Sequence, residues 1–426
     1  MRRISIVGVL GLLVLLLAAC GGSPGTKVTV RVSSENGQKS LPLSVAYQIE
    51  DGDWEWLQPD EAAGYSFYVP AGKERYGVAV RCGGLKTRMA PSYARATVYQ
   101  LSTSDTTEPV FTCPADEKTI IAEVNYDASS VTGAKGVMIF TEEGVGHYSN
   151  TSSTSPRIIG FSRSGKHDLL FAAYSTASYP DPNDLLAARL VRNVEVAEGT
   201  TIDLSLSNGD LVRRANVGPF SLPSHWHGSY IVGVITSNDT AFWYSTGLGG
   251  DGGGTYARIP NASSDDYYVL HAKASNQVSI HKELTLDSFD FVSAATAGDL
   301  QVNLPDPLPE SYEADGSSGR WHFALERPDG FTGVHMSSSI FGETKLDVWA
   351  SPAWLQGLDG YTIPDLSAIP GFAAFDNRAD GHWEYCVLGG DTALAEILSL
   401  PWRKYEPLPA GLAKPTRVTI SCANGS

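Results

Sequence analysis

The residue types most able to do chemistry are the two histidines of "HWHG", His225 and His227. On a β-strand, residues two apart point to the same side, so both imidazoles could bind one metal ion. Further ligands would have to come from His271 or His281, and neither stands at a spacing typical of a metal site. The pattern is more typical of exposed residues at a strand edge beside a packed Trp226. We therefore predict no metal-binding residue.

Two aromatic clusters could bind a ligand instead. Trp54 and Trp56 of "WEW" share one side of a predicted strand, where stacked indoles could form a platform for sugar rings. Trp243 and Tyr244 of "FWY" stand beside a glycine-rich stretch. The same residues would equally fill the core of a β-sandwich, because a buried aromatic side chain removes ~150–250 Å² from water. Both interpretations stay open, and these four residues form the candidate ligand face.

The sequence lacks the motifs of the common catalytic families. The stretch "GFSRSG" (160–165) resembles a serine-hydrolase motif but lacks its second glycine and is typical of a turn. The stretch "LGGDGGGTY" (248–256) leads into a strand, whereas a phosphate-binding loop needs a helix. Asp376, Asn377 and Asp380 of "FDNRADGHWEY" depart from EF-hand spacing and are typical of an Asx turn. We predict no catalytic residue and no cofactor.

Strands must position these residues, since apolar residues alternate with polar ones along the chain. Val28, Val30 and Val32 show the pattern, and Gly, Asn, Asp and Pro turn signals separate such runs. Only 183–190 and 391–398 predict short helices. In 65–82, 256–272 and 361–390 a strand ends at proline, a turn follows, and an apolar strand comes next. We interpret each of these three stretches as a hairpin.

The strand pattern also repeats along the chain. The segments "FTCPA" (111–115), "IDLSL" (202–206), "LQVNLP" (300–305) and "RVTISC" (417–422) resemble one another as closing strands of successive modules. Modules of this length with many short strands are typical of β-sandwiches. The sequence thus predicts an all-β protein of about four tandem β-sandwich-like modules with few short helices, at 27–115, 117–208, 217–305 and 316–423. In an alternative partition, 306–320 is an internal loop and the last two modules merge.

The cysteines predict two disulfides. Apart from Cys20, the chain has Cys82, Cys113, Cys386 and Cys422, without the CxxC spacing of a metal site. Three pairings are open from number alone. Spacing favours 82–113 and 386–422, because Cys82 and Cys386 end corresponding strands, whereas Cys113 and Cys422 lie in the segments interpreted as closing strands.

The N-terminus predicts export. Met1-Arg2-Arg3 is followed by an apolar run to Ala19, the layout of a signal peptide and too short for a membrane span. The following Leu17-Ala18-Ala19-Cys20 resembles the lipobox of bacterial lipoproteins. The resemblance implies a signal peptide over 1–19, diacylglycerol (palmitate-type) attachment to Cys20, a short linker over 20–26, and membrane anchoring. Gly21 after the cysteine favours the outer membrane or cell surface.

Composition excludes one class of partner. Without residues 1–20 the chain carries 29 Lys and Arg against 47 Asp and Glu, a net charge of −18. Such a surface repels phosphate backbones, so we expect no nucleic-acid binding. The body loosely resembles the immunoglobulin-like or carboxypeptidase-regulatory-like modules of bacterial surfaces. We expect a non-catalytic binding or scaffolding role at the cell envelope, toward a glycan or a protein. A glycan-active hydrolase with dispersed carboxylates and a purely structural spacer are the alternatives.

Overall fold

The computed structural model describes residues 25–34, 42–60, 64–83, 94–113, 120–142, 144–161, 163–177, 184–238, 240–249, 253–340, 344–375, 381–398, 402–403, 406–409 and 417–426. Strands dominate these residues, and the predicted all-β class with four sandwich-like modules is confirmed. Helical turns within the described ranges are short: η2 (Asn208–Asp210), α2 (Pro352–Leu355) and α3 (Leu394–Leu398).

Of the two predicted helices, one is found and one is wrong. The helix α3 lies within the predicted 391–398. The chain at 183–190, in contrast, enters strand β13 (Leu185–Val196) where the structure describes it. Ala187 packs toward the core of the second module, whereas Leu185 and Leu190 pack toward the third. A strand buried on both faces is almost continuously apolar, and such a run does not reveal its period.

The four modules share one strand topology. The first module shows all seven strands of it. Its first strand pairs antiparallel with the fourth and parallel with the seventh, and the other four strands form the facing sheet in the order 6-5-2-3. The strands are β1 (Thr26–Ser34), β2 (Ser44–Ile49), β3 (Glu55–Trp56), β4 (Tyr65–Val69), β5 (Arg75–Cys82), β6 (Ala94–Ser102) and β7 (Val110–Cys113).

The second module has the same pairings, including the parallel pair of first and seventh strands. Its strands are β8 (Ile120–Asp127), β9 (Gly136–Thr141), β10 (Gly144–Tyr148), β11 (Arg157–Phe161), β12 (Gly165–Tyr174), β13 and β14 (Thr201–Ser205). In the third module the seventh strand is reduced to one parallel bridge between Val217 and Leu300. The other strands are β15 (Arg213–Val217), β16 (His227–Ile235), β17 (Ala241–Gly249), β18 (Gly254–Arg258), β19 (Tyr267–Ser279) and β20 (Lys282–Ser293).

The fourth module departs from the pattern at its end. Its strands are β21 (His322–Ala324), β22 (Phe331–Ile340), β23 (Thr344–Ala350), β24 (Gly360–Thr362), β25 (His382–Gly390) and β28 (Arg417–Gly425), with the short pair β26 (Trp402–Arg403) and β27 (Glu406–Pro409) before the last. The strand β28 pairs with β25, as β6 pairs with β5. The segment "RVTISC" is therefore the sixth strand of its module, and its interpretation as a closing strand is wrong.

The segment 306–316 lies where a closing strand of the fourth module would pair. Asp315 and His322 exchange two backbone hydrogen bonds on the edge of β21 opposite β24. Leu308 and Tyr312 are buried in the core of the module, and Tyr312 donates a hydrogen bond to the carbonyl of Ala324. This part of the chain is thus packed into the fold and is not an exposed linker.

The predicted hairpins are wrong in the same way in three modules. The two strands of each stretch, such as β4 and β5, belong to different sheets and do not pair with each other. The same holds for β18 and β19 and for β24 and β25. Each stretch is an arch that crosses from one layer of the sandwich to the other. Alternation shows which side chains face a core but not which strand is the hydrogen-bonding partner.

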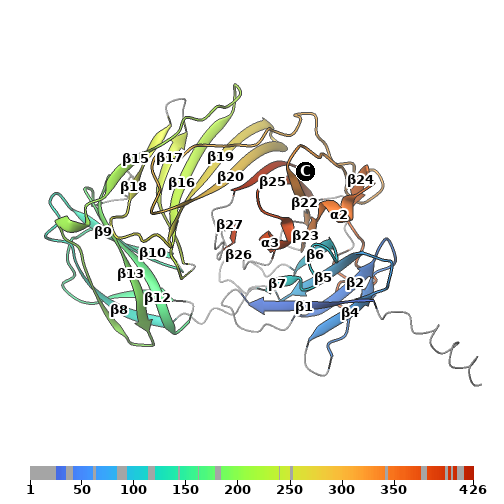
Figure 1. The fold of residues 1–426 in the computed structure, drawn as a ribbon, viewed down its shortest axis with the longest axis horizontal. Coiled ribbons are helices and arrows are strands. Elements are labelled where there is room, and N and C mark those ends of the chain that lie inside the picture. Colours follow the sequence, from blue (N-terminus) through green and yellow to red (C-terminus); the bar gives the residue numbers. More distant parts are fainter. Residues whose placement is uncertain are drawn as a thin grey trace, which may run out of the picture.

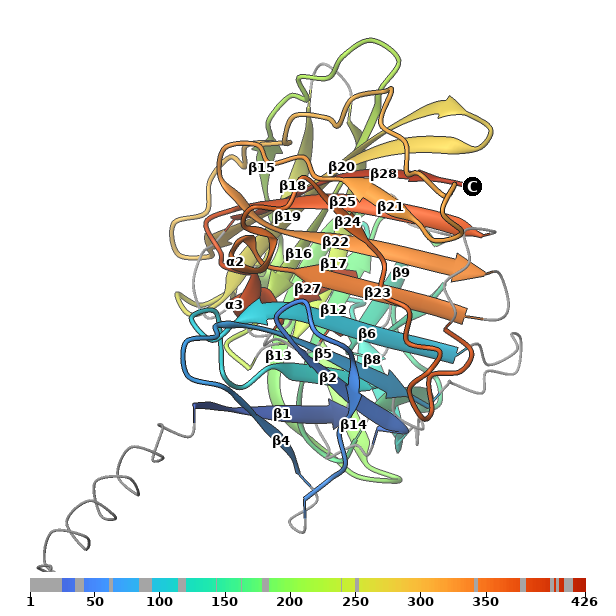
Figure 2. The same ribbon diagram turned by 90° about the vertical axis from the view of Figure 1, so that its right-hand side faces the viewer.

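Three modules share one twelve-stranded sheet. Its order is β17-β16-β19-β20-β28-β25-β22-β23-β6-β5-β2-β3, so that the four-stranded sheets of the third, fourth and first modules join edge to edge. The strand β20 pairs antiparallel with β28, and β23 pairs parallel with β6. Figure 1 shows the modules around an arch in the order second, third, fourth and first, and Figure 2 shows strands of the fourth and first modules side by side in one sheet.

The second module joins the arch by packing. Its four-stranded sheet and the third module share one apolar cluster, which includes Leu170, Tyr174 and Tyr268. The backbone of Leu190, on the edge strand β13, donates to and accepts from the side chain of Asn261. The loop before β19 therefore covers the edge that another strand covers in the neighbouring modules.

An arginine on the sixth strand accompanies each of these three contacts. Arg192 on β13 binds buried Asp266 with Nη1 3.0 Å and Nη2 2.5 Å from the two carboxylate oxygens. Arg95 on β6 lies 3.2 Å from buried Asp347, and Arg417 on β28 binds buried Asp290. The carboxylate of each pair is buried, whereas the side chains of Arg95 and Arg417 are about half exposed, so loss of the arginine would leave an uncompensated buried carboxylate.

The two predicted cysteine pairs are found at disulfide distance. Cys82 on β5 is bonded to Cys113 on β7, with 5.4 Å between the Cα atoms, and the bond links the two layers of the first module. Cys386 and Cys422 are bonded across adjacent strands β25 and β28, with their Cα atoms 4.1 Å apart. The pairing is as predicted, but the supposed equivalence of Cys113 and Cys422 is wrong, because only Cys113 lies on a seventh strand.

The contact between the second and third modules can be tested at Asp266. We expect Asp266→Asn to lower the free energy of unfolding by about 3–5 kcal/mol, because Arg192 loses its charged partner inside the contact. Urea denaturation followed by tryptophan fluorescence measures the change. The neighbouring exposed residue provides the control: Asp265→Asn should leave the midpoint unchanged, and equal effects of both variants would contradict the role of the ion pair.

Candidate functional site

The structure does not assemble the histidines of "HWHG" into a site. His225 precedes β16 with a left-handed backbone, φ 75°, so it does not share a strand with His227. Trp226 between them is buried, as expected. His271 instead forms a pair with Asp287, with 2.7 Å between Nε2 and Oδ1, and stacks on Phe289. His281 lies in the turn between β19 and β20, outside this pair.

The four residues of the candidate ligand face lie at opposite ends of the large sheet. Trp56 is exposed on β3, whereas Trp54 is half-buried with its indole against Gly77. Trp243 and Tyr244 lie on β17, the other edge strand. Tyr244 is buried, donates its hydroxyl to the carbonyl of Ala257, and has a pKa raised well above its usual range by burial. Of the four side chains, only that of Trp56 is exposed enough to form a platform for a ligand.

The remaining sequence candidates are only partly visible. Asp376, Asn377 and Asp380 lie outside the described residues, as do Gly250, Asp251 and Gly252 of the glycine-rich stretch. Where that stretch is described again, it forms β18, in agreement with the strand expected after it. Ser162 of "GFSRSG" is likewise outside the described part, and Gly165 begins β12.

A polar hollow lies at the contact between the third and fourth modules. It has a volume of about 520 Å³ and is formed where the β19–β20 hairpin, the end of β28 and the start of β25 come together. Residues of both charges and several amides and hydroxyls line it: Gln277, His281, Lys282, Glu283, Ser337, Ser339, Lys345, His382, Trp383, Glu384 and Asn424. Strand pairing across the two modules therefore creates a concave surface that neither module has alone.

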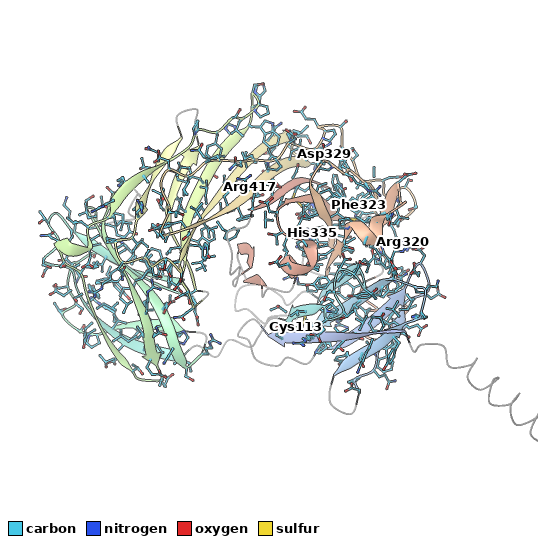
Figure 3. All side chains as sticks on the ribbon, in the orientation of Figure 1. Cys113, Arg320, Phe323, Asp329, His335 and Arg417 are labelled. Atoms are coloured by element: carbon cyan, nitrogen blue, oxygen red, sulfur yellow. A yellow bond between two sulfur atoms is a disulfide. The ribbon has the colours of Figure 1, made fainter. Side chains whose placement is uncertain are left out.

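A cluster of charged residues lies on the sheet beside this hollow. His335 on β22 places Nε2 3.1 Å from Oδ1 of Asp347 on β23 and Nδ1 3.9 Å from Oε1 of Glu384 on β25. Its ring stacks on Trp349, with 4.2 Å between centroids. Lys345 lies 3.1 Å from Asp347, the carboxylate that also binds Arg95 of the first module. Figure 3 shows His335 among the strands of the fourth module.

Asp347 is the electrostatic centre of the cluster. Burial would raise its pKa, but Lys345, the hydrogen bond with His335, and Arg95 together hold the pKa of this carboxyl well below its usual range. The carboxylate in turn raises the pKa of Lys345. An ionised carboxylate only accepts hydrogen bonds, so the shared proton lies on Nε2 of His335. The other ring nitrogen, Nδ1, lies 3.9 Å from Oε1 of Glu384.

No motif in the sequence marks these residues. In "VHMSSSI" and "KLDVWA", polar and apolar residues alternate only over the first few positions, and the two strands lie far from β6 in sequence. A charged residue at the centre of an apolar strand, such as Asp347, was the available signal. Its partners could not be inferred, because Arg95 reaches it only through the pairing of β6 with β23.

Comparisons with known proteins identify no family. No family model and no curated protein match the sequence. Similar solved structures include the Bacillus anthracis TIE protein, with 7% identity and a TM-score of 0.15 over 66% of this chain and 51% of that one. A streptococcal ancillary pilin has 11% identity and a TM-score of 0.12, over 57% of this chain and 89% of that chain. The chicken CNTN1 FN1–FN3 domains have 9% identity and a TM-score of 0.14, over 85% and 94%.

The chain spans about half the length of the first of these structures. TM-scores this low carry no argument about relationship or function. The sites described above therefore rest on their own geometry.

The electrostatics of the cluster predict how Asp347→Asn responds to pH. Because the pKa of Asp347 is lower in the folded chain than in the unfolded one, the carboxylate stabilises the fold above about pH 4, the usual range of Asp. We expect the variant to lose about 3 kcal/mol at pH 7, and the difference from the wild type to shrink as the pH falls below 4. Urea unfolding between pH 3 and pH 8 measures it.

Exposed Asp359 provides the matched control, and Asp359→Asn should not change the stability. A loss in Asp347→Asn that stays constant down to pH 3 would show that packing, and not charge, explains the effect.

Proposed function

We propose that this protein is a lipid-anchored binding protein of the bacterial cell envelope and that the hollow between the third and fourth modules holds its ligand. The observation that carries the proposal is the concave polar surface of about 520 Å³, within the range of small-molecule sites. A purely structural spacer is less well supported, because a spacer needs no concave surface.

The lining favours a neutral, hydroxyl-rich ligand such as a sugar residue of a glycan. The amides of Gln277 and Asn424 and the hydroxyls of Ser337 and Ser339 can donate and accept hydrogen bonds. Lysines and glutamates occur together in the lining, so neither sign of charge predominates.

A glycan-active hydrolase remains the second candidate, supported by a pair of carboxylates. Glu283 on β20 and Glu384 on β25 are both in register with Asn424 on the strand between them and line the same hollow. Two strand spacings place their Cα atoms about 10 Å apart. Glycoside hydrolysis needs two carboxyl groups about 5–10 Å apart. Cleavage of a bound glycan by the wild type, and its loss in the Glu384→Gln variant, would favour the hydrolase over the binding protein.

The anchor belongs to the proposal on sequence grounds. Cys20 and the apolar run before it lie outside the described residues. Within the described ranges, no helix has the length and apolar character needed to span a membrane. Attachment through a lipid on Cys20 would hold the four modules at the surface of a membrane without such a helix.

A glycan array tests the hollow. We expect a double variant, Gln277→Ala with Asn424→Ala, to bind its glycan about 5- to 150-fold more weakly, because two lost hydrogen bonds together cost about 1–3 kcal/mol. Trp56→Ala, a change at the far edge of the sheet, is the control and should bind normally. Retained binding in the double variant together with loss in Trp56→Ala would move the site to the exposed tryptophan.

Mass spectrometry of the protein purified from bacterial membranes tests the anchor. We expect the mature chain to begin at an acylated Cys20. The Cys20→Ser variant should be absent from the membrane fraction. A mature chain with a free amine on any other residue would contradict lipidation.

A further inference from the structure

The disulfide Cys386–Cys422 lies beside a histidine and a glutamate, residue types that can bind metal ions. Cys386 is in register with His335 on one neighbouring strand and with Cys422 on the other. Ligand atoms of His335, Glu384 and Cys386 all lie within 4.8 Å of one another. Cys386 Sγ is 3.1 Å from Oε1 of Glu384. One sulfur, an imidazole and a carboxylate thus lie close together on the sheet, and the second sulfur, of Cys422, is bonded to the first.

The imidazole is oriented as in a metal site. Metal-binding histidines usually donate their second ring N–H to a carboxylate, which fixes the ring and the tautomer. His335 has this arrangement, since Nε2 binds buried Asp347 at 3.1 Å and the ring is held against Trp349. The remaining nitrogen, Nδ1, lies 3.9 Å from Oε1 of Glu384, the carboxylate that belongs to the same group of ligand atoms.

The other disulfide has no such surroundings. Cys82 and Cys113 lie in the apolar core of the first module, among Val30, Tyr76 and Phe111. No His, Asp or Glu of the described residues forms a ligand group with them. The comparison separates a purely structural disulfide from one placed among polar ligands.

We propose that reduction of the Cys386–Cys422 disulfide creates a binding site for a thiophilic divalent ion such as Zn²⁺, with Cys386, Cys422, His335 and Glu384 as ligands. The reductant is an external dithiol: its two thiols become a disulfide, and its two electrons and two protons convert the cystine to two thiols. Binding of the ion then releases both thiol protons.

The geometry requires only local movement. A tetrahedral Zn²⁺ with bonds of about 2.3 Å to sulfur holds two thiolates roughly 3.8 Å apart, a separation that side-chain rotation on adjacent strands can supply. Glu384 and Asn424 line the polar hollow, and each stands two residues from one of the cysteines on the same side of its strand. The hollow therefore ends two residues along each strand from the disulfide, whose two cysteines are themselves buried. Asp347 acts as a positioning residue that does not touch the ion.

Cobalt titration of the full-length mature protein tests the proposal. The protein is reduced with a phosphine, desalted without oxygen, and titrated with Co²⁺, whose thiolate charge-transfer and tetrahedral visible absorption bands report sulfur ligands. We expect one Co²⁺ per reduced chain, displaced by Zn²⁺, and no such absorption from the oxidised chain. Circular dichroism of the same samples establishes that the reduced chain stays folded.

Matched variants assign the ligands. The double variant Cys386→Ser with Cys422→Ser should show no thiolate absorption, although the phosphine still reduces Cys82 and Cys113 in it. The variant His335→Ala should bind Co²⁺ at least ~10-fold more weakly. Asp347→Asn should keep the spectrum but weaken binding about 10–100-fold. His382→Ala, a histidine at the wall of the hollow, is the control and should bind as the wild type does.

Three outcomes would overturn the proposal. They are no thiolate absorption in the reduced wild type, an unchanged spectrum in the double cysteine variant, and a reduced chain that is unfolded and is not refolded by the metal. The glycan-binding proposal does not depend on the result, because glycan binding by the oxidised protein is measured separately.

Discussion

The sixth strand of each module has a free edge, and the way in which that edge is covered determines the whole molecule. An uncovered strand edge exposes unpaired backbone groups that attract other chains. Here β6 pairs with β23, β20 and β28 pair with each other, and Asn261 binds the backbone of β13. Each of the three contacts therefore uses the free edge of a sixth strand, although its partner is a third strand in one contact, another sixth strand in the second and a loop in the other. The arch in Figure 1 follows from this rule.

The shared sheet also places chemistry where no single module has it. The hollow is formed by strands of the third and fourth modules, and the carboxylate of Asp347 in the fourth binds Arg95 of the first. In an isolated sandwich the outer face of such a sheet would be ordinary solvated surface. Joining the sheets edge to edge buries part of that face, so charged residues there must find partners. The ion pairs between modules and the candidate site are thus consequences of the same burial.

The two disulfides show how similar pairings can have different roles. Cys82–Cys113 crosses between the layers of the first module and is surrounded by apolar side chains. Cys386–Cys422 joins two strands that are already hydrogen-bonded to each other, so it adds little to their alignment. Its position between His335, Glu384 and the polar hollow gives it surroundings in which thiolates could bind an ion. The spacing of the cysteines in sequence, 31 and 36 residues, does not distinguish the two.

The sequence by itself determined the strands, the faces that they bury and the cysteine pairs, because alternation has a period of two and each of these properties is local or nearly so. It did not determine the partners of the strands, so hairpins were expected where the chain makes arches, and β28 was taken for a seventh strand. It also could not reveal the His335–Asp347–Glu384 cluster or the hollow. Those depend on strands such as β6 and β23, about 250 residues apart in the chain, and only the tertiary structure decides which free edge meets which.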